Sequence, residues 1–452
     1  MGDVVRGVLL ALLACSSSGC ALLFPPQTSP PPDAQSGFVV RAKEGPLLAG
    51  AATVDISPQT DLLLGGFGIW RRGRGVHDPI HVRALALQKQ QLSVVILSAD
   101  LIGLHHHVAE EVRARLWDIG GFDGLVLLHC THNHDAPDTL GMWGLPPFVS
   151  GIDGDYLRFA IDSLERAARQ AVAALAPVRV RWGQEETPGK GISRNLREPM
   201  LVDRRVTALA FDRFDGLPVA TLVHFACHPE TLGSRNRLVS ADFPGAMARA
   251  VEESRPGSVT VFLNGPLGGM VTVDEQAETF EEVERIGRGI AATAIAAIAQ
   301  GQEFPNEAPL ITSFVNVDVP IQNRAYHLAN LFGLFGPRRF HKHGERRGTT
   351  PSDVQAILLG PLTIVTAYGE LLPRPAFEFE GSVEVPGPLL IVSLGNDELG
   401  YLIHERDFAR RKYRYERTVS PGPLATTLWR QAAAIVLDAI IRQADGVSAP
   451  QG

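Results

Sequence analysis

The most informative segment of the sequence is Gly124-Leu-Val-Leu-Leu-His-Cys-Thr-His-Asn-His-Asp-Ala-Pro-Asp138. Its apolar run, residues 125–128, is typical of a buried strand. The chain then turns polar at once, with three histidines and two aspartates, and Pro137 prevents the strand from continuing. Polar side chains gathered where a strand leaves an α/β sheet are where such folds bind ligands. The alternative is a surface loop that is rich in histidine by chance.

The spacing of the histidines favours a joint role. His132 and His134 are two residues apart, so in extended backbone both side chains point to the same side and could face one ion or substrate. A second strand end repeats this pattern, because the apolar residues 219–226 lead into His228 and Glu230. The sequence therefore has two predicted strands that each end in histidine and an acid.

Two further candidates follow apolar runs near the end of the chain, Glu370 and Tyr401. Zinc prefers imidazole nitrogen supplemented by carboxylate oxygen, and a catalytic site leaves one position for water. The sequence contains no His-Glu-x-x-His helix, Gly-x-Ser-x-Gly elbow or phosphate loop. These residues are far apart in the chain, so their spacing does not show that they converge. The residues alone thus lead to the hypothesis of an α/β metal hydrolase, with an exposed Glu370 as the alternative.

The composition fits a globular protein, with 452 residues, 45% hydrophobic and 20% charged. This length suits two or three average domains, or one large core with insertions. The formal net charge of −7 argues against a nucleic-acid-binding surface. No repeat or second independent domain is recognisable, so we interpret residues 47–447 as a single catalytic domain. No protein partner is predicted.

The first 46 residues have the features of export and tethering. Residues 1–20 contain a short apolar run that cannot span a bilayer but suits a signal peptide. Leu12-Leu-Ala-Cys15 resembles the lipobox of bacterial lipoproteins, and Cys20 is a poorer second candidate. The Pro- and Ser-rich residues 21–46 are typical of a semi-rigid tether. We expect an exported protein, attached to the membrane of the cell envelope through a lipid on Cys15. An ordinary cleaved signal is the alternative.

Two cysteines remain outside this leader, Cys130 and Cys227. A single pair cannot form a disulfide-rich scaffold. We predict that both are buried free thiols. A bridge between them is the alternative, since the chain is predicted to be exported.

Hydrophobic periodicity predicts an alternation of strands and helices. Residues 81–87 and 92–101 are predicted as paired strands, separated by a polar turn. Helices are predicted around residues 108–116, 156–175, 281–299 and 424–444. Further strands are predicted at residues 178–182, 206–211, 219–226, 259–263, 311–319, 354–359, 362–371 and 389–394. This alternation predicts an α/β fold of layered mixed β-sheets flanked by helices.

Beyond these patterns, His129-Cys-Thr-His-Asn-His-Asp-Ala-Pro137 resembles the Gly-Thr-His-Thr-His-Ser-Gly-Pro segment of the neutral ceramidase family. Further stretches agree with that family in the same order, over roughly residues 48–423. They are Ala49-Gly-Ala-Ala-Thr-Val-Asp-Ile-Ser-Pro58, Gly75-Val-His-Asp-Pro-Ile-His-Val-Arg-Ala84, Ile192-Ser-Arg-Asn195, His224-Phe-Ala-Cys-His228 with Val239-Ser-Ala-Asp242, and Thr366-Ala-Tyr-Gly-Glu370 with the later Tyr401 and Tyr415-Glu416. The order of the motifs makes the resemblance specific, and it implies the fold of the family's catalytic domain.

The resemblance also implies a zinc centre. Its metal ligands would be His132, His228, Glu370 and Tyr401. The catalytic residues would be His134, Arg194 and Tyr415, with His134 contacting the scissile amide or the attacking water. Zinc lowers the pKa of bound water and polarises a carbonyl. His134 and Tyr415 would stabilise the developing oxyanion.

One glycine-rich turn, Asn264-Gly-Pro-Leu-Gly-Gly-Met270, departs from the family pattern. The family has Gly-Asp-x-Ser-Pro in this turn, whereas this chain lacks the matching aspartate and serine, and Thr272 is out of register. Gly268 and Gly269 still allow backbone N–H groups to approach closely, so we predict that they bind substrate. Little sequence follows Pro423, so we do not expect the family's C-terminal accessory domain.

These observations predict a zinc-dependent hydrolase of the neutral ceramidase type, which cleaves an amide or ester bond of a lipid or other N-acyl compound. One alternative is a catalytically silent envelope protein that binds a lipid and uses zinc structurally. A second alternative is a metal-dependent esterase or lactonase that acts on a small polar substrate.

Overall fold

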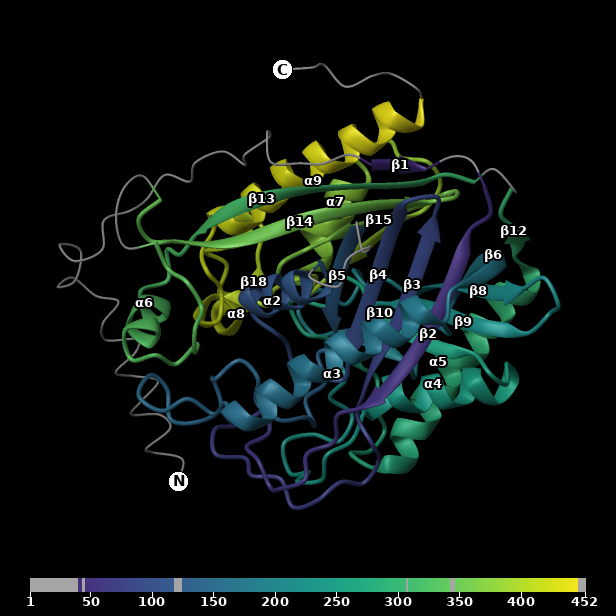
Figure 1. The fold of residues 1–452 in the computed structure, drawn as a ribbon. Coiled ribbons are helices and arrows are strands. Elements are labelled where there is room, and N and C mark those ends of the chain that lie inside the picture. The colour runs from purple at the N-terminus through teal and green to yellow at the C-terminus, as the bar shows by residue number, and fades with distance from the viewer. Residues whose placement is uncertain (1–39, 43–44, 118–123, 306–307, 342–345, 446–452) are drawn as a thin grey trace.

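The computed structural model describes residues 40–42, 45–117, 124–305, 308–341 and 346–445 (Figure 1). Two large β-sheets form its centre, and the larger runs in the order β10-β9-β8-β6-β2-β3-β4-β5, with β12 beside β6. Its strands are β2 (Leu48–Asp55), β3 (His81–Lys89), β4 (Leu92–Ala99), β5 (Gly124–Cys130), β6 (Ala176–Glu186), β8 (Arg205–Arg213), β9 (Pro218–Phe225), β10 (Val259–Asn264) and β12 (Gln302–Glu303).

The smaller sheet runs in the order β1-β13-β14-β15-β17. Its strands are β1 (Val40–Ala42), β13 (Leu310–Pro320), β14 (Thr349–Leu359), β15 (Leu362–Thr366) and β17 (Leu389–Val392). Two short pairs complete the sheet structure, β7 (Ser193–Asn195) with β11 (Val271–Val273) and β16 (Glu370–Leu371) with β18 (Tyr401–Leu402). Parallel and antiparallel neighbours occur in both large sheets.

The two large sheets pack against each other through one apolar layer. Alternate residues of β3 point to opposite faces, as the pleat of a strand requires. Leu85 and Leu87 join the layer between the sheets, together with Ile357 and Ile364 of the smaller sheet. Val82 points instead into the core on the helix side. Burial on both faces explains why these strands are nearly continuous apolar runs in the sequence.

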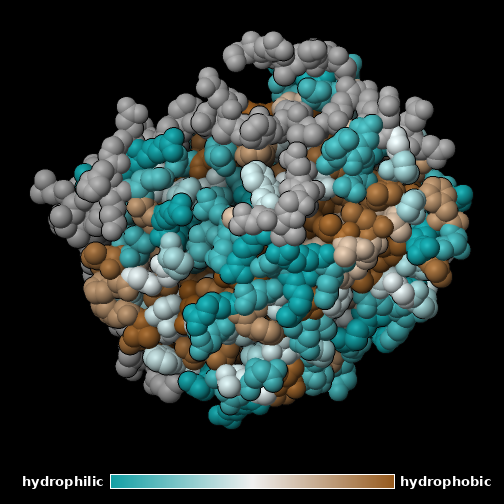
Figure 2. Space-filling model, in the orientation of Figure 1, coloured by the Kyte–Doolittle hydropathy of each residue, from teal (hydrophilic) through white to brown (hydrophobic). Residues whose placement is uncertain are grey.

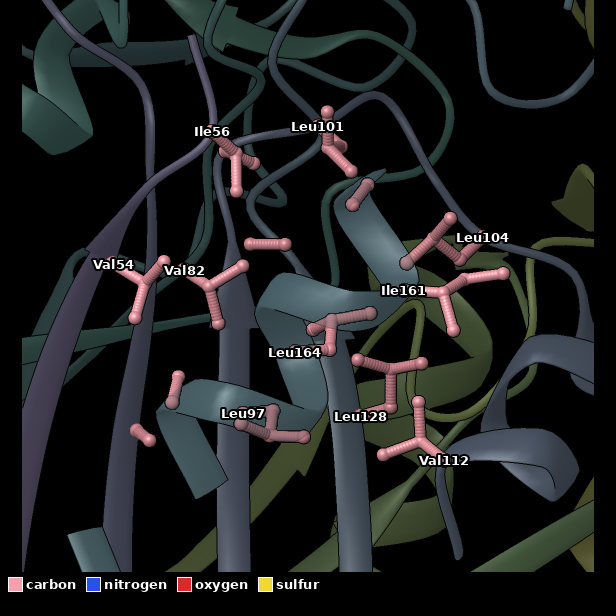
Figure 3. Close-up of a cluster of buried hydrophobic side chains, with 14 of the residues drawn as sticks. Val54, Ile56, Val82, Leu97, Leu101, Leu104, Val112, Leu128, Ile161 and Leu164 are labelled. Carbon is pink, nitrogen blue, oxygen red and sulfur yellow. The ribbon is translucent and has the colours of Figure 1, made fainter. Parts of the chain in front are cut away.

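Helices cover the outer face of each sheet (Figure 1). The larger sheet carries α2 (His106–Trp117), α3 (Gly154–Ala173), α4 (Asp242–Ser254) and α5 (Phe280–Gln300). The smaller sheet carries α6 (Arg324–Leu331), α7 (Pro373–Glu380) and α9 (Leu424–Ala444), and the short α8 (Arg414–Thr418) precedes α9. Figure 3 shows Ile161 and Leu164 of α3 beside Leu97 and Leu128 of the sheet. Each such side chain contributes roughly 1.5–3 kcal/mol through burial.

Helix α9 is long and apolar enough to cross a membrane by length and composition, but half of its most apolar window is buried inside the protein. Figure 1 shows it lying along β13 and β14. Its Trp429 is fully buried and donates a hydrogen bond to the Thr366 carbonyl at 2.9 Å. The Trp429 ring packs at a tilt against Phe379, with a centroid distance of 5.0 Å. These contacts explain the apolar sequence of α9 as that of a core helix. On the face drawn in Figure 2, hydrophilic and hydrophobic side chains are intermixed.

The predicted fold class, layered mixed sheets flanked by helices, is confirmed. The pairing of residues 81–87 with 92–101 is confirmed as the antiparallel β3–β4 ladder. Cys130 and Cys227 are both free and buried, as predicted. The predicted signal peptide and most of the tether lie outside the described residues, and the division of the chain into leader, tether and one domain stays a prediction.

One expectation about local structure is wrong, and one helix was not predicted. Residues 362–371 are not one strand, because β15 ends at Thr366 and the chain leaves the sheet before Glu370 enters β16. Helix α4 was not predicted. Its first turn contains Pro244 and Gly245, which weaken the helical pattern although Pro is tolerated there.

Asp242 at the start of α4 provides a test by pH. It is completely buried and accepts hydrogen bonds from the Thr231 backbone N–H at 2.9 Å and hydroxyl at 2.6 Å. Burial, together with the charge of Asp135, raises the pKa of Asp242 to about 7. The folded protein therefore binds this proton more tightly than the unfolded chain. Protonated Asp242 therefore contributes to the free energy of unfolding. This contribution is fully present below the pKa of the carboxyl group in the unfolded chain, and it is lost as the pH rises through about 7.

We expect Asp242→Asn to remove the loss of stability that Asp242 causes as the pH rises. Between about pH 4 and pH 8 the free energy of unfolding of the variant should improve relative to the unmodified protein, by roughly 1–3 kcal/mol. Urea denaturation of both proteins at the two pH values measures the change. If the free energies of unfolding of the two proteins differ by the same amount at both pH values, the prediction is contradicted.

Candidate metal centre

The two edge strands of the larger sheet, β5 and β10, are joined by a buried histidine. His129 on β5 accepts a hydrogen bond at Nε2 from the Asn264 backbone N–H of β10 at 3.0 Å. Its Nδ1 lies 3.1 Å from the Ser98 hydroxyl, which donates to the Phe262 carbonyl at 2.7 Å. Burial lowers the pKa of His129 to about 3, so the ring is neutral. His129 thus closes the sheet, and both of its ring nitrogens are occupied.

Asn264 also holds the two histidine-bearing loops together. Its side-chain N–H groups donate to the carbonyls of Thr131 at 3.0 Å and Cys227 at 2.9 Å. Its Oδ1 accepts the Cys227 backbone N–H at 3.0 Å. The residues that follow Thr131 and Cys227 are His132 and His228. Because Asn264 is completely buried, its three bonds fix the relative position of both loops.

The ring orientations of His132 and His228 are set by backbone carbonyls. His132 has a positive φ of 66°, and its Nδ1 lies 2.7 Å from the Ile102 carbonyl. The Nδ1 of His228 lies 2.8 Å from the Val271 carbonyl. A carbonyl can only accept, so each Nδ1 carries a proton and each Nε2 is directed elsewhere. Both Nε2 atoms face Glu370 Oε2, at 3.5 Å from His132 and 2.9 Å from His228.

The imidazole of His134 lies beside this pair without a hydrogen-bond partner among the described residues. Both of its ring nitrogens are buried and unbonded. Ligand atoms of His132, His134 and His228 lie within 4.8 Å of one another. The nearest acid is Glu230, whose Oε2 is 3.5 Å from the His134 Nδ1. A buried imidazole with no bond in the protein is the kind of group that binds a metal ion or a substrate.

The wall behind His134 is formed by the loop of residues 65–68. The ring of Phe67 packs edge-on against His134 at 4.9 Å. Gly66 has a φ of +90°, and a Cβ at this position would collide with the imidazole. This loop appears in the sequence only as a flexible glycine-rich segment. In the structure it is a close-packed support for His134.

The electrostatics of the cluster suit a cation. Burial would raise the pKa of Glu370, but the charges and hydrogen bonds of His132 and His228 lower it to about 2. Burial would lower the pKa of His228, but the hydrogen bond and charge of Glu370 raise it. Burial, and the charges of His132, His228 and Arg71, keep the pKa of His134 well below its ordinary value. The centre therefore combines an ionised carboxylate with a neutral His134.

Tyr401 and Tyr415 lie next to this cluster. Tyr401 pairs with Glu370 in the parallel β16–β18 ladder, and its ring is 6.0 Å from that of Tyr415. Both tyrosines line a cavity of about 920 Å³, together with His132, His134 and Glu370. Most of the remaining lining is apolar, including Met142, Trp143, Phe335 and Leu399. Tyr415 is 51% exposed, but partial desolvation and the charge of Glu370 raise its pKa to about 12, so its hydroxyl keeps its proton at neutral pH.

Four predicted site residues lie outside the described lining of this cavity: His228, which faces Glu370, and Arg194, Gly268 and Gly269. Arg194 forms ion pairs with Glu275 at 2.8 Å and Asp274 at 3.5 Å. Gly268 and Gly269 support the backbone that carries Glu370. The N–H of Gly268 donates to the Leu371 carbonyl at 2.9 Å, and a Cβ on Gly268 would collide with the Glu370 carbonyl. Gly269 has a φ of +70° and packs against Leu372.

This close approach gives a prediction for Gly268→Ala. The added methyl group has to displace the backbone of Glu370, so we expect a loss of about 10–100-fold in activity and roughly 1–3 kcal/mol in stability. Gly189→Ala is the matched control, since a Cβ there meets only the Arg204 guanidinium at 3.6 Å. Kinetics and thermal denaturation of both variants measure the effect. Equal behaviour of the two variants would show that the contact has no role.

Sequence patterns missed further residues near the centre. Asn264 had no signal beyond its place at a strand end. Glu398 lines the cavity with one carboxylate oxygen bound to the Gly400 N–H at 2.7 Å and the other buried without a partner among the described residues. It follows an apolar run, as Glu370 does, and this was the signal that could have found it. Glu230 was part of the second histidine motif, but it was not among the predicted site residues.

Comparison with known proteins shows the family of the chain. Residues 47–306 match the model of the neutral/alkaline non-lysosomal ceramidase family, in its N-terminal region. The chain belongs to this family. Family membership indicates a hydrolase, and it confirms the resemblance seen in the sequence motifs. A comparison with curated proteins finds no match.

Solved ceramidase structures share the fold. The neutral ceramidase from Pseudomonas aeruginosa matches with a TM-score of 0.73 and 18% identity, over 88% of this chain and 75% of that one. A ceramidase complexed with C2 matches with the same TM-score and identity, over 88% of this chain and 76% of that one. The ceramidase fold therefore extends beyond the matched region to most of the chain.

The residues of this ceramidase-family chain fit a metal ion. His132, His134 and His228 are buried with their ligand atoms close together, and the carboxylate of Glu370 faces two of them. Backbone carbonyls fix two of the imidazoles through Nδ1, as is usual for metal-binding histidines. The unbonded nitrogens of His134 are the observation that a hydrogen-bonded cluster alone does not explain.

Proposed function

We propose that the protein is a zinc-dependent hydrolase that cleaves the amide bond of an N-acyl lipid such as ceramide. Support comes from family membership and from the convergence of His132, His228 and Glu370 beside the unbonded His134. That convergence is the observation on which the proposal rests. In this proposal Tyr401 completes the metal ligands, because it pairs with Glu370 at the cavity wall.

The side chains have distinct parts in this proposed reaction. When bound, zinc supplies a Lewis acid and lowers the pKa of water. His134 accepts or donates a proton at the scissile amide, since its low pKa leaves it neutral and its nitrogens are unbonded. The protonated hydroxyl of Tyr415 donates a hydrogen bond to the oxyanion that develops at the carbonyl.

The cavity supports a lipid-like substrate. Its lining is mostly apolar, and about 920 Å³ is large enough for a drug-sized molecule. Acyl chains gain roughly 0.8 kcal/mol for each CH₂ group that is buried. The apolar lining, and not the polar cluster, would therefore supply most of the binding energy for an N-acyl lipid.

The glycine-rich turn, residues 264–270, favours a substrate other than ceramide. Thr272 is buried in β11, bridges to His228, and is not among the described residues that line the cavity. No hydroxyl group therefore takes the place of the serine that the family has in this turn. An esterase or lactonase acting on a smaller substrate, and a silent lipid-binding protein with structural zinc, are the competing functions.

Metal analysis combined with an N-acyl amide and ester screen separates these functions. We expect one zinc per chain and hydrolysis of N-acyl amides. We expect His134→Ala to retain zinc and to lose about 10²–10³ in kcat, because it removes one catalytic group. If the protein contains zinc but hydrolyses no substrate, and if His134→Ala changes neither result, the silent lipid-binding protein would be supported. Turnover of esters or lactones alone would support the esterase.

A further inference from the structure

Some of the charged side chains that line the cavity have no partner of opposite charge among the described residues. Glu370 faces the histidines, and Arg338 donates to both carboxylate oxygens of Asp397 at 2.8 and 2.7 Å. Glu398 accepts the Gly400 N–H through one carboxylate oxygen at 2.7 Å. The two that remain are Arg414 and Arg417 of α8.

The guanidinium groups of Arg414 and Arg417 form no hydrogen bond or ion pair with any residue that the structure describes. Their neighbours in the chain behave differently, because Arg410 pairs with Asp407 and Lys412 with Glu198. Arg414 is exposed, but Arg417 is half-buried. A half-buried guanidinium has lost part of its hydration, and a missing carboxylate leaves that cost without compensation.

The position of these arginines relates them to the reacting bond. Both belong to the α8 wall of the cavity, which also carries Tyr415. The Tyr415 ring lies 6.0 Å from that of Tyr401, the partner of Glu370. Figure 1 shows α8 beside β18. A group bound by the arginines would therefore lie close to the scissile amide, and an acyl chain would occupy the apolar lining.

We propose that the substrate carries an acidic group close to its scissile amide, and that Arg414 and Arg417 bind this group. The inference rests on the proposed function, and it narrows the substrate class to N-acyl compounds with a carboxylate, sulfonate or phosphate, a group that ceramide itself lacks. Guanidinium groups bind such oxyanions through paired, charge-assisted hydrogen bonds. An arginine pair at the cavity also opposes the formal net charge of −7, which would otherwise repel an anionic substrate.

The test compares two ligands of equal size, N-dodecanoylglycine and N-dodecanoylglycinamide. They differ only in a carboxylate that replaces a carboxamide near the amide bond. Calorimetry with the full chain is expected to show about tenfold tighter binding of the acid. Raising the ionic strength from about 0.05 M to about 0.5 M should reduce this preference, because salt screens exposed charges.

Variants test whether Arg414 and Arg417 cause the tighter binding of the acid. Arg414→Gln/Arg417→Gln should bind both ligands within about twofold of each other, with unchanged affinity for the amide. Arg411→Gln is the matched control, since Arg411 is exposed, lies three residues from Arg414 and is not among the described residues of the lining. Equal binding of the two ligands by the unmodified protein would overturn the proposal. So would a preference that survives the double substitution, or one that Arg411→Gln also abolishes.

The binding readout keeps this proposal separate from the proposed function. A preference for the acid that depends on Arg414 and Arg417, without hydrolysis of either ligand, would support the anion site and contradict the hydrolase. Hydrolysis of both ligands at equal rates, with equal affinities, would support the hydrolase and contradict the anion site.

Discussion

The variant His132→Ala/His228→Ala is expected to purify without stoichiometric zinc and to lose about 10³ or more of its activity on N-acyl amides. The two imidazoles contribute the Nε2 atoms that face Glu370, at 3.5 and 2.9 Å. Without them the carboxylate has no neighbouring nitrogen ligands on that side. A lone buried carboxylate prefers to take up a proton, because burial disfavours its charge.

Metal content by elemental analysis and initial rates measure this result. His77→Ala is the control for the loss of any histidine, since its side chain is 44% exposed and pairs with Asp78, away from the cluster. Circular dichroism shows whether the double variant is folded. A folded double variant that keeps stoichiometric zinc would refute the assignment of the metal centre.

The second large effect is expected for Arg71→Met, which should destabilise the protein by about 3–5 kcal/mol. Arg71 is 2% exposed and pairs with the completely buried Asp135 at 2.9 Å. It also donates to the carbonyls of Gly65 and His134. Removing the guanidinium leaves the Asp135 charge in a low-dielectric interior, with Asn236 as a remaining donor at 2.8 Å.

Urea denaturation gives the free energy of unfolding. Arg72→Met is the control, because Arg72 is exposed and its guanidinium bonds, among the described residues, to the Asp61 carbonyl alone, at 3.1 Å. The double substitution Arg71→Met/Asp135→Leu should recover part of the loss, since it removes the stranded charge as well. A loss of less than about 1 kcal/mol in Arg71→Met would show that the pair does not hold the His134 loop in place.

The sequence predicted what depends on local patterns. Residues 125–128 and 219–226 are apolar runs followed by histidines, and both form strands whose ends meet at the candidate metal centre. Nothing local could predict the partner of Arg71, because Asp135 lies 64 residues later in the chain. The same holds for the bond between His129 and Asn264, which are 135 residues apart.

The resemblance to ceramidases assigned roles to residues that no local pattern could assign. It placed Tyr401 beside Glu370, and the structure has them paired. It placed Arg194 in the active site, whereas the structure pairs this side chain with Glu275 and Asp274. Gly268 was predicted to approach substrate, but its close contact is with the Glu370 backbone. A motif identifies a position, and tertiary packing decides what its side chain contacts.

The bond from His129 to Asn264 has a consequence for how the protein would respond to metal removal. Because this bond and the Asn264 side chain connect the loops of His132 and His228, the metal site exists only when distant ends of the sheet have met. Ion binding is then linked to global unfolding, and a ligand bound only by the folded state raises the melting temperature with its concentration. A chelator should therefore lower the melting temperature of the whole molecule, and a fragment that lacks β10 should not hold the ion.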